Sequence, residues 1–456
     1  MIDPHEEPTP QTETSTGGGE AAAKRSALES LRISPYHLLI VAVLFLAQVF
    51  AGVSMQNLPY LAPAIIRELR FDPQALGILF GISVVSSAVG AMLAGAIGDL
   101  VGPKRVTIFA VLGFGLATAL SSRANTFVEL ALLRFVAGFC NGGAMPNVIT
   151  LAAQFAPARY RATIVTTVVA GFPAGATLAG VVMTTLLAPD AWRMAFLLAG
   201  IMSVAVAPLI FVVVPEALPF LLARPGGPER ARKILVRLGG SPEGPISWDA
   251  MVTRSRAPLL DIFRRDWIRT SLLLAAIFML VLIDVYFLAN WLPILMERTG
   301  ASSGRALSLT AIFNFGGIVG VVLLGRLIDY IGVRRVLFTL LISGSAALAF
   351  MALAGTANAA FTPVLVIAGM AFLGGSGVLN ALPALLYPPA LRSTAGGWAI
   401  GAGHLGGASG PILGGYLLQA GWQPQQALLL AAVLPLLALV MSTWLVTADR
   451  ARGGHQ

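Results

Sequence analysis

The chain has 456 residues, of which 57% are hydrophobic and only 11% are charged, against roughly 25% charged in an ordinary soluble domain. This composition excludes a typical soluble protein and predicts an all-α membrane protein, because lipid-embedded backbone must satisfy its own hydrogen bonds. The net charge of +9 does not indicate a nucleic-acid partner, since most of the 30 Lys and Arg residues fall on one side of the predicted spans. That side is predicted to be cytoplasmic and to hold both termini.

Residues 1–36 are polar and are predicted to form a disordered cytoplasmic tail. Six predicted spans occupy residues 37–214 and six more occupy residues 267–448. The intervening residues 215–266 are basic and rich in Pro and Gly, which predicts a cytoplasmic linker with a short amphipathic helix, and residues 449–456 form a second tail. The twelve spans are expected to begin near His37, Gln74, Val106, Thr126, Arg161, Ala191, Trp267, Arg305, Val336, Phe361, Ser393 and Gln425.

The chain contains an internal duplication. The segment GAIGDLVGPKRV, which begins at Gly95, recurs as GRLIDYIGVRRV, which begins at Gly325, at an offset of 230 residues. Pro63 and Pro293 are separated by the same offset. Both halves are predicted to start on the same side of the membrane, as in parallel repeats about an axis along the membrane normal. The sequence therefore predicts two pseudo-symmetric six-helix bundles with a cavity between them.

The doubled segment resembles the turn signature of the major facilitator superfamily. Its glycines allow close helix approach, and its aspartates can accept hydrogen bonds at the N-terminus of a neighbouring helix. The resemblance implies that the two turns gate the inward-facing side; the alternative is a topological turn with no moving part. The candidate gating residues are Gly95, Asp99, Gly102, Arg105, Gly325, Asp329, Gly332 and Arg335.

Further segments resemble the aromatic acid:proton symporter branch of that superfamily, among them LLRFVAGFCNGGAMPN (132–147), VPEALPFLLAR (214–224) and GWAIGAGHLGGASGPILGG (397–415). The resemblance implies uptake of a benzoate-, hydroxybenzoate- or gallate-like anion with protons across a bacterial inner membrane by a functional monomer. Alternatives are a symporter for another organic acid, a proton-driven efflux carrier, or a membrane receptor that does not transport. No enzyme motif, metal-ligand cluster or nucleotide-binding loop is found, so no cofactor is expected.

One departure from the branch concerns its acidic residues. The branch usually carries a DGFD-like pair of acids in the first helix, and alignment on Pro63 places those positions at Ala51 and Ser54. The internal register pairs Ser54 with Asp284, midway along the seventh span. We infer that the acid has moved to the symmetry-related helix, where Asp284 carries the proton, because an intramembrane ionisable residue is a functional candidate by default. The alternative is a structural hydrogen bond to a neighbouring helix.

Two basic residues are candidates for proton coupling and for binding a substrate carboxylate. Arg134 lies inside the fourth span and is expected to pair with Asp284 or with the substrate, or to form a fixed structural ion pair. His404 stands where the branch more often has Arg; its alternative role is a neutral imidazole hydrogen-bonded inside the bundle. Amides and aromatic rings complete the predicted substrate site, although each could instead serve packing: Gln56, Asn57, Tyr286, Asn290, Asn314, Asn380 and Trp398.

Overall fold

The computed structural model describes residues 34–185, 191–222, 226–238, 259–388 and 391–453, and these ranges are helical with short turns and connections. Most of the predicted N-terminal tail and part of the predicted linker lie outside them. The first six long helices are α2 (Pro35–Leu69), α3 (Pro73–Val101), α4 (Pro103–Ser121), α5 (Phe127–Phe155), α6 (Arg161–Thr185) and α7 (Trp192–Val213). A short 3₁₀ turn, η1 (Ala158–Tyr160), precedes α6.

The second half repeats this series with one broken span. Its elements are α10 (Ile268–Arg298), α11 (Ser303–Ile331), α12 (Val333–Ala354), α13 (Phe361–Gly369), η4 (Met370–Gly374), α14 (Ser376–Leu379), α15 (Leu382–Leu386), α16 (Arg392–Gln419) and α17 (Pro424–Gly453). Between the halves lie α8 (Leu218–Leu222), α9 (Gly227–Arg237) and η3 (Leu259–Phe263). The predicted positions of the spans are confirmed to within a few residues.

Helix starts follow local chemistry. Proline occupies the first turn of α2, α3 and α4, where its missing N–H costs nothing. Side-chain oxygens cap the exposed N–H groups, as where Asp72 accepts from the Ala75 N–H of α3 at 2.6 Å. Thr126 and Glu129 form a reciprocal capping box at the start of α5. These signals explain why the sequence alone places the helix boundaries closely.

Eleven helices of the described part are long and apolar enough to cross a membrane. The twelfth predicted span is α16, which has 28 residues but is rich in glycine and therefore less apolar. Its glycines pack against α3 and α10, so its place in the fold makes it the twelfth transmembrane helix. The all-α membrane architecture is confirmed.

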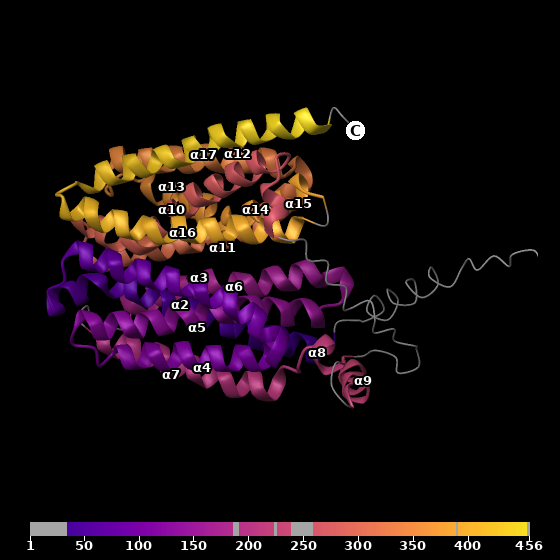
Figure 1. The fold of residues 1–456 in the computed structure, drawn as a ribbon. Helices are drawn as coiled ribbons and strands as arrows, with labels where there is room; N and C mark the ends of the chain where they lie inside the picture. The colour runs from indigo at the N-terminus through magenta and orange to yellow at the C-terminus, as the bar shows by residue number, and fades with distance from the viewer. Residues whose placement is uncertain (1–33, 186–190, 223–225, 239–258, 389–390, 454–456) are drawn as a thin grey trace, which may run out of the picture.

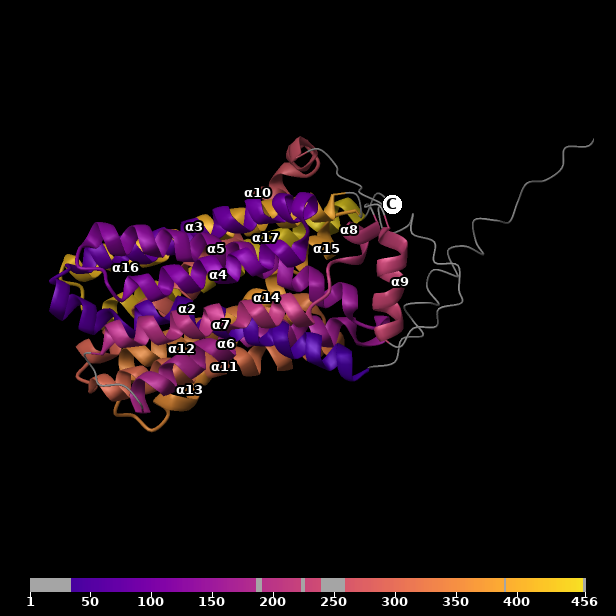
Figure 2. The same cartoon turned by 90° about the horizontal axis from the view of Figure 1, so that it is seen from below.

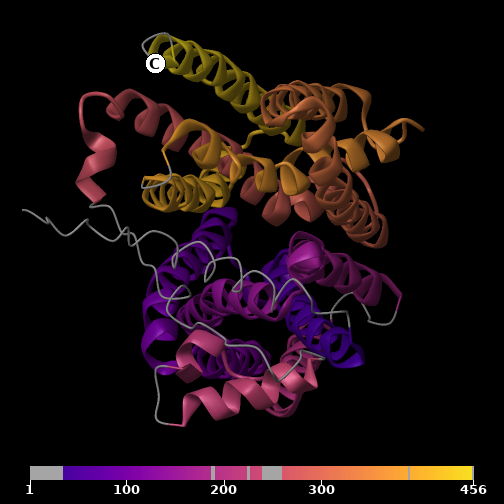
Figure 3. The same cartoon turned by 90° about the vertical axis from the view of Figure 1, so that its right-hand side faces the viewer.

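The helices form two bundles. In Figure 1, α2–α7, coloured indigo to magenta, lie together below α10–α17, coloured orange to yellow. The view along the helices in Figure 3 separates the same two groups. The repeat is visible in helix bounds, because α3 and α11 each have 29 residues and are followed by a glycine with positive φ, Gly102 at 107° and Gly332 at 83°. Only glycine adopts such a φ without strain, which explains why each repeat turns at this residue.

The two ends of the molecule carry different connections between the helices. The turn end carries Gly102 and Gly332, and the far end carries the α2–α3 and α10–α11 connections. Figure 2 shows α9 lying across the turn end, nearly perpendicular to the bundles. This is the short amphipathic helix expected in the linker: it buries Ala231, and Leu238 just after it, while Lys233 and Arg237 are exposed.

The tenth span differs from the single helix expected. It consists of α13, the π-helical turn η4 and α14, after which α15 follows. At Gly369 and Gly374 there is no room for a Cβ, because backbone atoms of α11 lie against both positions. The extra residue in the π turn accompanies this close approach, a geometry that recurs at functional positions in helices.

Candidate transport site

Arg134 lies inside the first bundle, where only 2% of the residue is exposed. Its Nη2 donates to the Ser121 hydroxyl at 2.8 Å and to the Thr118 hydroxyl at 3.3 Å, both on α4. The guanidinium carbon lies 4.9 Å from the centre of the Phe196 ring on α7. Its Nε is buried and has no hydrogen-bond partner. Within the described residues, hydroxyl groups and one aromatic ring surround this cation, and no carboxylate forms an ion pair with it.

Ser54 of α2 belongs to the same cluster. Its hydroxyl shares a hydrogen bond with the Thr118 hydroxyl, which in turn accepts from Arg134. Ser54 is 2% exposed. The position at which the resemblance places an acid is therefore one hydroxyl group away from the buried cation, and in this chain it is uncharged. We call Ser54, Thr118, Ser121, Arg134 and Phe196 the Arg134 cluster.

Asp284 lies inside the second bundle, on α10, and is 0% exposed. Neither of its carboxylate oxygens has a hydrogen-bond partner. Ile277, Leu288 and Leu295 share its helix face and are also fully buried in the hydrophobic core. The predicted alternative of a structural hydrogen bond is not observed, and neither is an ion pair with Arg134, which lies on α5 of the other bundle.

Several predicted amide groups lie where the bundles meet. The Gln56 amide of α2 donates to the Ala289 carbonyl of α10 at 3.4 Å. The Asn314 amide of α11 donates to the Tyr60 hydroxyl of α2 at 3.2 Å. Both are hydrogen bonds between the two bundles. The structure thus brings Gln56 and Asn314 to the interface, and it adds Tyr60, whose role in this contact the sequence did not indicate.

Tyr286 and Asn290 lie one turn apart on α10. The Asn290 amide donates to the Tyr286 carbonyl at 2.7 Å, and the Tyr286 ring lies against Gly407 of α16. His404 stands one turn earlier on α16, and its Nδ1 is 2.9 Å from the Ile400 carbonyl of its own helix. Of these three candidates, none is hydrogen-bonded to Arg134 or Asp284 in the described structure.

Three other predicted substrate residues lie apart from Tyr286, Asn290 and His404. The Asn57 amide donates to the Ala195 carbonyl inside the first bundle at 3.5 Å. Asn380 is exposed at the end of α14. Trp398 lies near the turn end of α16, where its indole N–H donates to the Ser271 carbonyl at 3.1 Å. The structure therefore does not bring these three residues together with Tyr286, Asn290 and His404, and the Asn57 Oδ1 is buried without a hydrogen-bond partner.

The bundles are pressed together at the far end. Gly77 of α3 lies against Gly415 and the Pro411 carbonyl of α16, so that a Cβ at Gly77 would collide with backbone. The Phe80 ring meets the Trp291 ring edge-on, with centroids 5.5 Å apart. The Trp291 indole N–H donates to the same Pro411 carbonyl at 2.9 Å. This far-end seam joins α3 of one bundle to α10 and α16 of the other.

The first repeated turn is held by the segment that follows α7. The backbone N–H of Lys104 donates to Glu216 Oε1 at 3.0 Å, and its Nζ donates to the Phe211 carbonyl at 2.7 Å. Glu216 thereby satisfies a free N–H at the start of α4. Sequence reasoning missed this contact, although the acid of VPEALP was the available signal.

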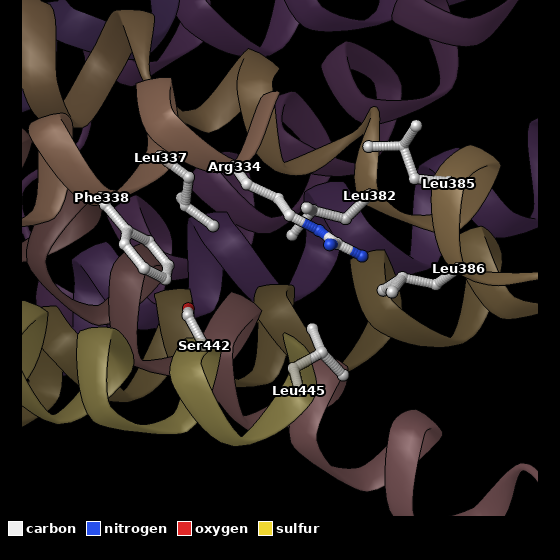
Figure 4. A pocket seen from close by; sticks show the side chains of 8 residues that line it. All are labelled: Arg334, Leu337, Phe338, Leu382, Leu385, Leu386, Ser442 and Leu445. Carbon is white, nitrogen blue, oxygen red and sulfur yellow. The ribbon is translucent and has the colours of Figure 1, made fainter. Parts of the chain in front are cut away.

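The other gating candidates are less informative. The side-chain surroundings of Gly95, Asp99 and Gly325 lie outside the described part of the structure. Asp329, Gly332, Arg335 and Arg105 are exposed at the turn end. A small hydrophobic crevice at that end lies between α12, α15 and α17 and contains none of the predicted site residues; Figure 4 shows its leucines together with Phe338, Ser442 and Arg334.

The family model of the Major Facilitator Superfamily matches residues 44–399 and 274–456. The chain belongs to the major facilitator superfamily. It is accordingly a multi-pass membrane transport protein and not an enzyme, and no metal-binding group of His, Cys, Asp or Glu occurs among its described residues.

Within the superfamily, the chain is similar to aromatic-acid transporters. A 4-hydroxybenzoate transporter of Pseudomonas aeruginosa is 31% identical over 428 residues, which are 91% of this chain and 95% of that protein. A gallate transporter of Pseudomonas putida is 29% identical and covers 86% of this chain and 88% of its own length. A benzoate transport protein of Acinetobacter baylyi is also 29% identical, over 86% of this chain and 85% of that protein. The predicted branch is therefore confirmed.

Solved structures agree on the superfamily fold. The xylose transporter XylE from E. coli, in a partially occluded inward open conformation, has a TM-score of 0.69 at 16% identity and covers 89% of this chain and 97% of its own. The nucleoside transporter NupG has a TM-score of 0.67 at 13% identity and covers 91% of this chain and 99% of its own. At such identities the likeness shows the fold alone.

Proposed function

We propose that this superfamily member imports a small aromatic carboxylate, of benzoate, hydroxybenzoate or gallate type, together with at least one proton. The names of its relatives support the substrate class. We further propose that it works in a bacterial inner membrane as a monomer, with both termini and the turn end in the cytoplasm. The distribution of Lys and Arg supports this orientation.

The observation that carries proton coupling is the isolation of Asp284. An ionised carboxylate without hydrogen-bond partners in an apolar core is strongly disfavoured, so the group is stable there as the neutral acid. We assign it the transported proton: it is protonated when water reaches it from outside and deprotonated when water reaches it from the cytoplasm. We propose that one bundle rocks against the other, so that water reaches Asp284 from one side of the membrane at a time.

The far-end seam supports alternating access. Its contacts close the end that we assign to the outside, and they are made by backbone atoms and rings without an ion pair among the residues that form them. Gln56 and Asn314 link the bundles in the same region and must separate when the outside opens. The substrate is proposed to bind between the bundles below this seam, near Tyr286, Asn290 and His404.

Arg134 favours an anionic substrate from inside the first bundle, because its charge has no carboxylate partner among the described residues. His404 is the candidate for direct contact with the carboxylate, since its Nε2 is left available when Nδ1 is held by the backbone. Asp284 and Arg134 would then act on the proton and the anion from separate bundles.

A thermal-shift screen of the purified protein tests the substrate class. Benzoate, hydroxybenzoates, gallate, phenylpropanoates and aliphatic acids are compared, and each acid is compared with its amide. Aromatic acids are expected to stabilise the protein, and His404→Ala is expected to weaken binding of the acid more than binding of the amide. Equal stabilisation by aliphatic acids would instead support a general organic-acid symporter.

A further inference from the structure

The Arg134 cluster contains a positive charge that nothing in the described protein neutralises. Arg134 has two hydroxyl partners and one ring, and its Nε–H points at no acceptor. The predicted counter-charge, Asp284, is in the other bundle with both oxygens unpartnered. Arg134 and Asp284 therefore do not form an ion pair with each other in the described structure.

A buried cation of this kind is costly. Removing a charge from water without a partner carries a penalty that hydrogen bonds to neutral hydroxyls offset only in part. The neighbouring Ser54 cannot help, because its hydroxyl is already shared with Thr118 and carries no charge. Since no described carboxylate partners Arg134, a mobile anion can supply the negative charge in the absence of substrate.

We propose that the Arg134 cluster binds one small inorganic anion, a halide of chloride size, when the transporter holds no substrate. The free Nε–H of Arg134 is the donor for this anion, and the Ser54–Thr118 hydroxyl pair lies beside it. The site selects a small ion because Ser54, Ser121 and Arg134 are at most 2% exposed, which leaves no open wall for an aromatic acid. This inference concerns the substrate-free protein and does not depend on the proposed substrate or on proton coupling.

The test uses the purified full chain without substrate at constant pH. Thermal unfolding is followed in sodium gluconate and in mixtures with sodium chloride or bromide at equal ionic strength. The midpoint of the wild type is expected to rise by about 3 °C or more, in proportion to the logarithm of the halide concentration above the Kd, as for a ligand that binds only the folded state.

Ser54→Asp is the decisive variant, because it places a fixed carboxylate one hydroxyl away from the guanidinium. Its midpoint is expected to be insensitive to halide. Ser54→Asn has nearly the same shape without the charge and is expected to keep the wild-type response to halide. General salt effects act equally on both variants, so the difference between them reports the halide site. The proposal is overturned if the wild type melts at the same temperature in all three salts, or if both variants respond equally. Since neither substrate nor a pH gradient is used, such a failure would leave the proposed import function standing.

Discussion

The isolation of Asp284 leads to a quantitative expectation for Asp284→Asn. The amide has the shape of the protonated acid, and the change removes no described hydrogen bond because both carboxylate oxygens lack partners. We therefore expect the free energy of unfolding to change by no more than about 1 kcal/mol. The effect on substrate accumulation driven by the proton gradient should be far larger. For one proton carried with a monovalent anion, a pH difference of one unit supplies about 1.36 kcal/mol and supports roughly tenfold accumulation.

The assay is uptake of labelled substrate into proteoliposomes that are one pH unit more acidic outside. Wild-type protein is expected to approach roughly tenfold accumulation, whereas Asp284→Asn should only equilibrate the two sides. Exchange of internal unlabelled for external labelled substrate should persist in the variant, because exchange requires no net proton movement. Glu297→Gln, at the partly exposed end of the same helix, is the matched control and should behave as wild type. Accumulation by Asp284→Asn against the gradient would refute the assignment of the proton to this residue.

Two further changes test the bundle contacts. Gly77→Val should prevent the far-end seam from closing, because its side chain meets backbone of α16; an overpacking cost of about 1–3 kcal/mol on this state should lower the initial rate of uptake about tenfold, while Gly401→Val, which has open space around it, should not. Equal rates for the two valine variants would contradict the seam. Glu216→Gln should weaken the cap on the Lys104 N–H, lower stability by about 1 kcal/mol and lower the melting midpoint by about 2–4 °C, with exposed Glu229→Gln unchanged. A midpoint that does not move would show that the charge of this cap is unimportant.

The positions of the helices could be predicted because their signals are local. Apolar runs, first-turn prolines and capping side chains lie within or beside the spans. The repeat offset of 230 residues is found by comparing the sequence with itself. The broken tenth span could not be predicted in the same way. Its π-helical turn depends on how Gly369 and Gly374 approach α11, and that approach is a property of packing between helices rather than of the segment itself.

The candidate site was predictable only in part. The burial of Arg134 and Asp284 followed from charged residues inside apolar runs, and the structure places both away from solvent. Their surroundings did not follow, because Thr118 and Phe196 come from other helices and are unremarkable in an apolar sequence. Trp398 shows the opposite limit: it was chosen for its residue type, and its position near the turn end reflects where α16 begins.

The glycine-rich surface of α16 has a consequence for how the protein is assembled in the membrane. Gly403, Gly407 and Gly410 carry no apolar side chains that could interact with lipid, and among the described long helices α16 is the one that is not apolar enough to count as a span. Partition into the bilayer depends on side-chain hydrophobicity, so this segment gains less than its neighbours from entering lipid alone. The glycine faces that let α3 and α10 approach so closely therefore make α16 dependent on those partners for insertion. We expect it to leave the translocation machinery only when α10 is already present to receive it.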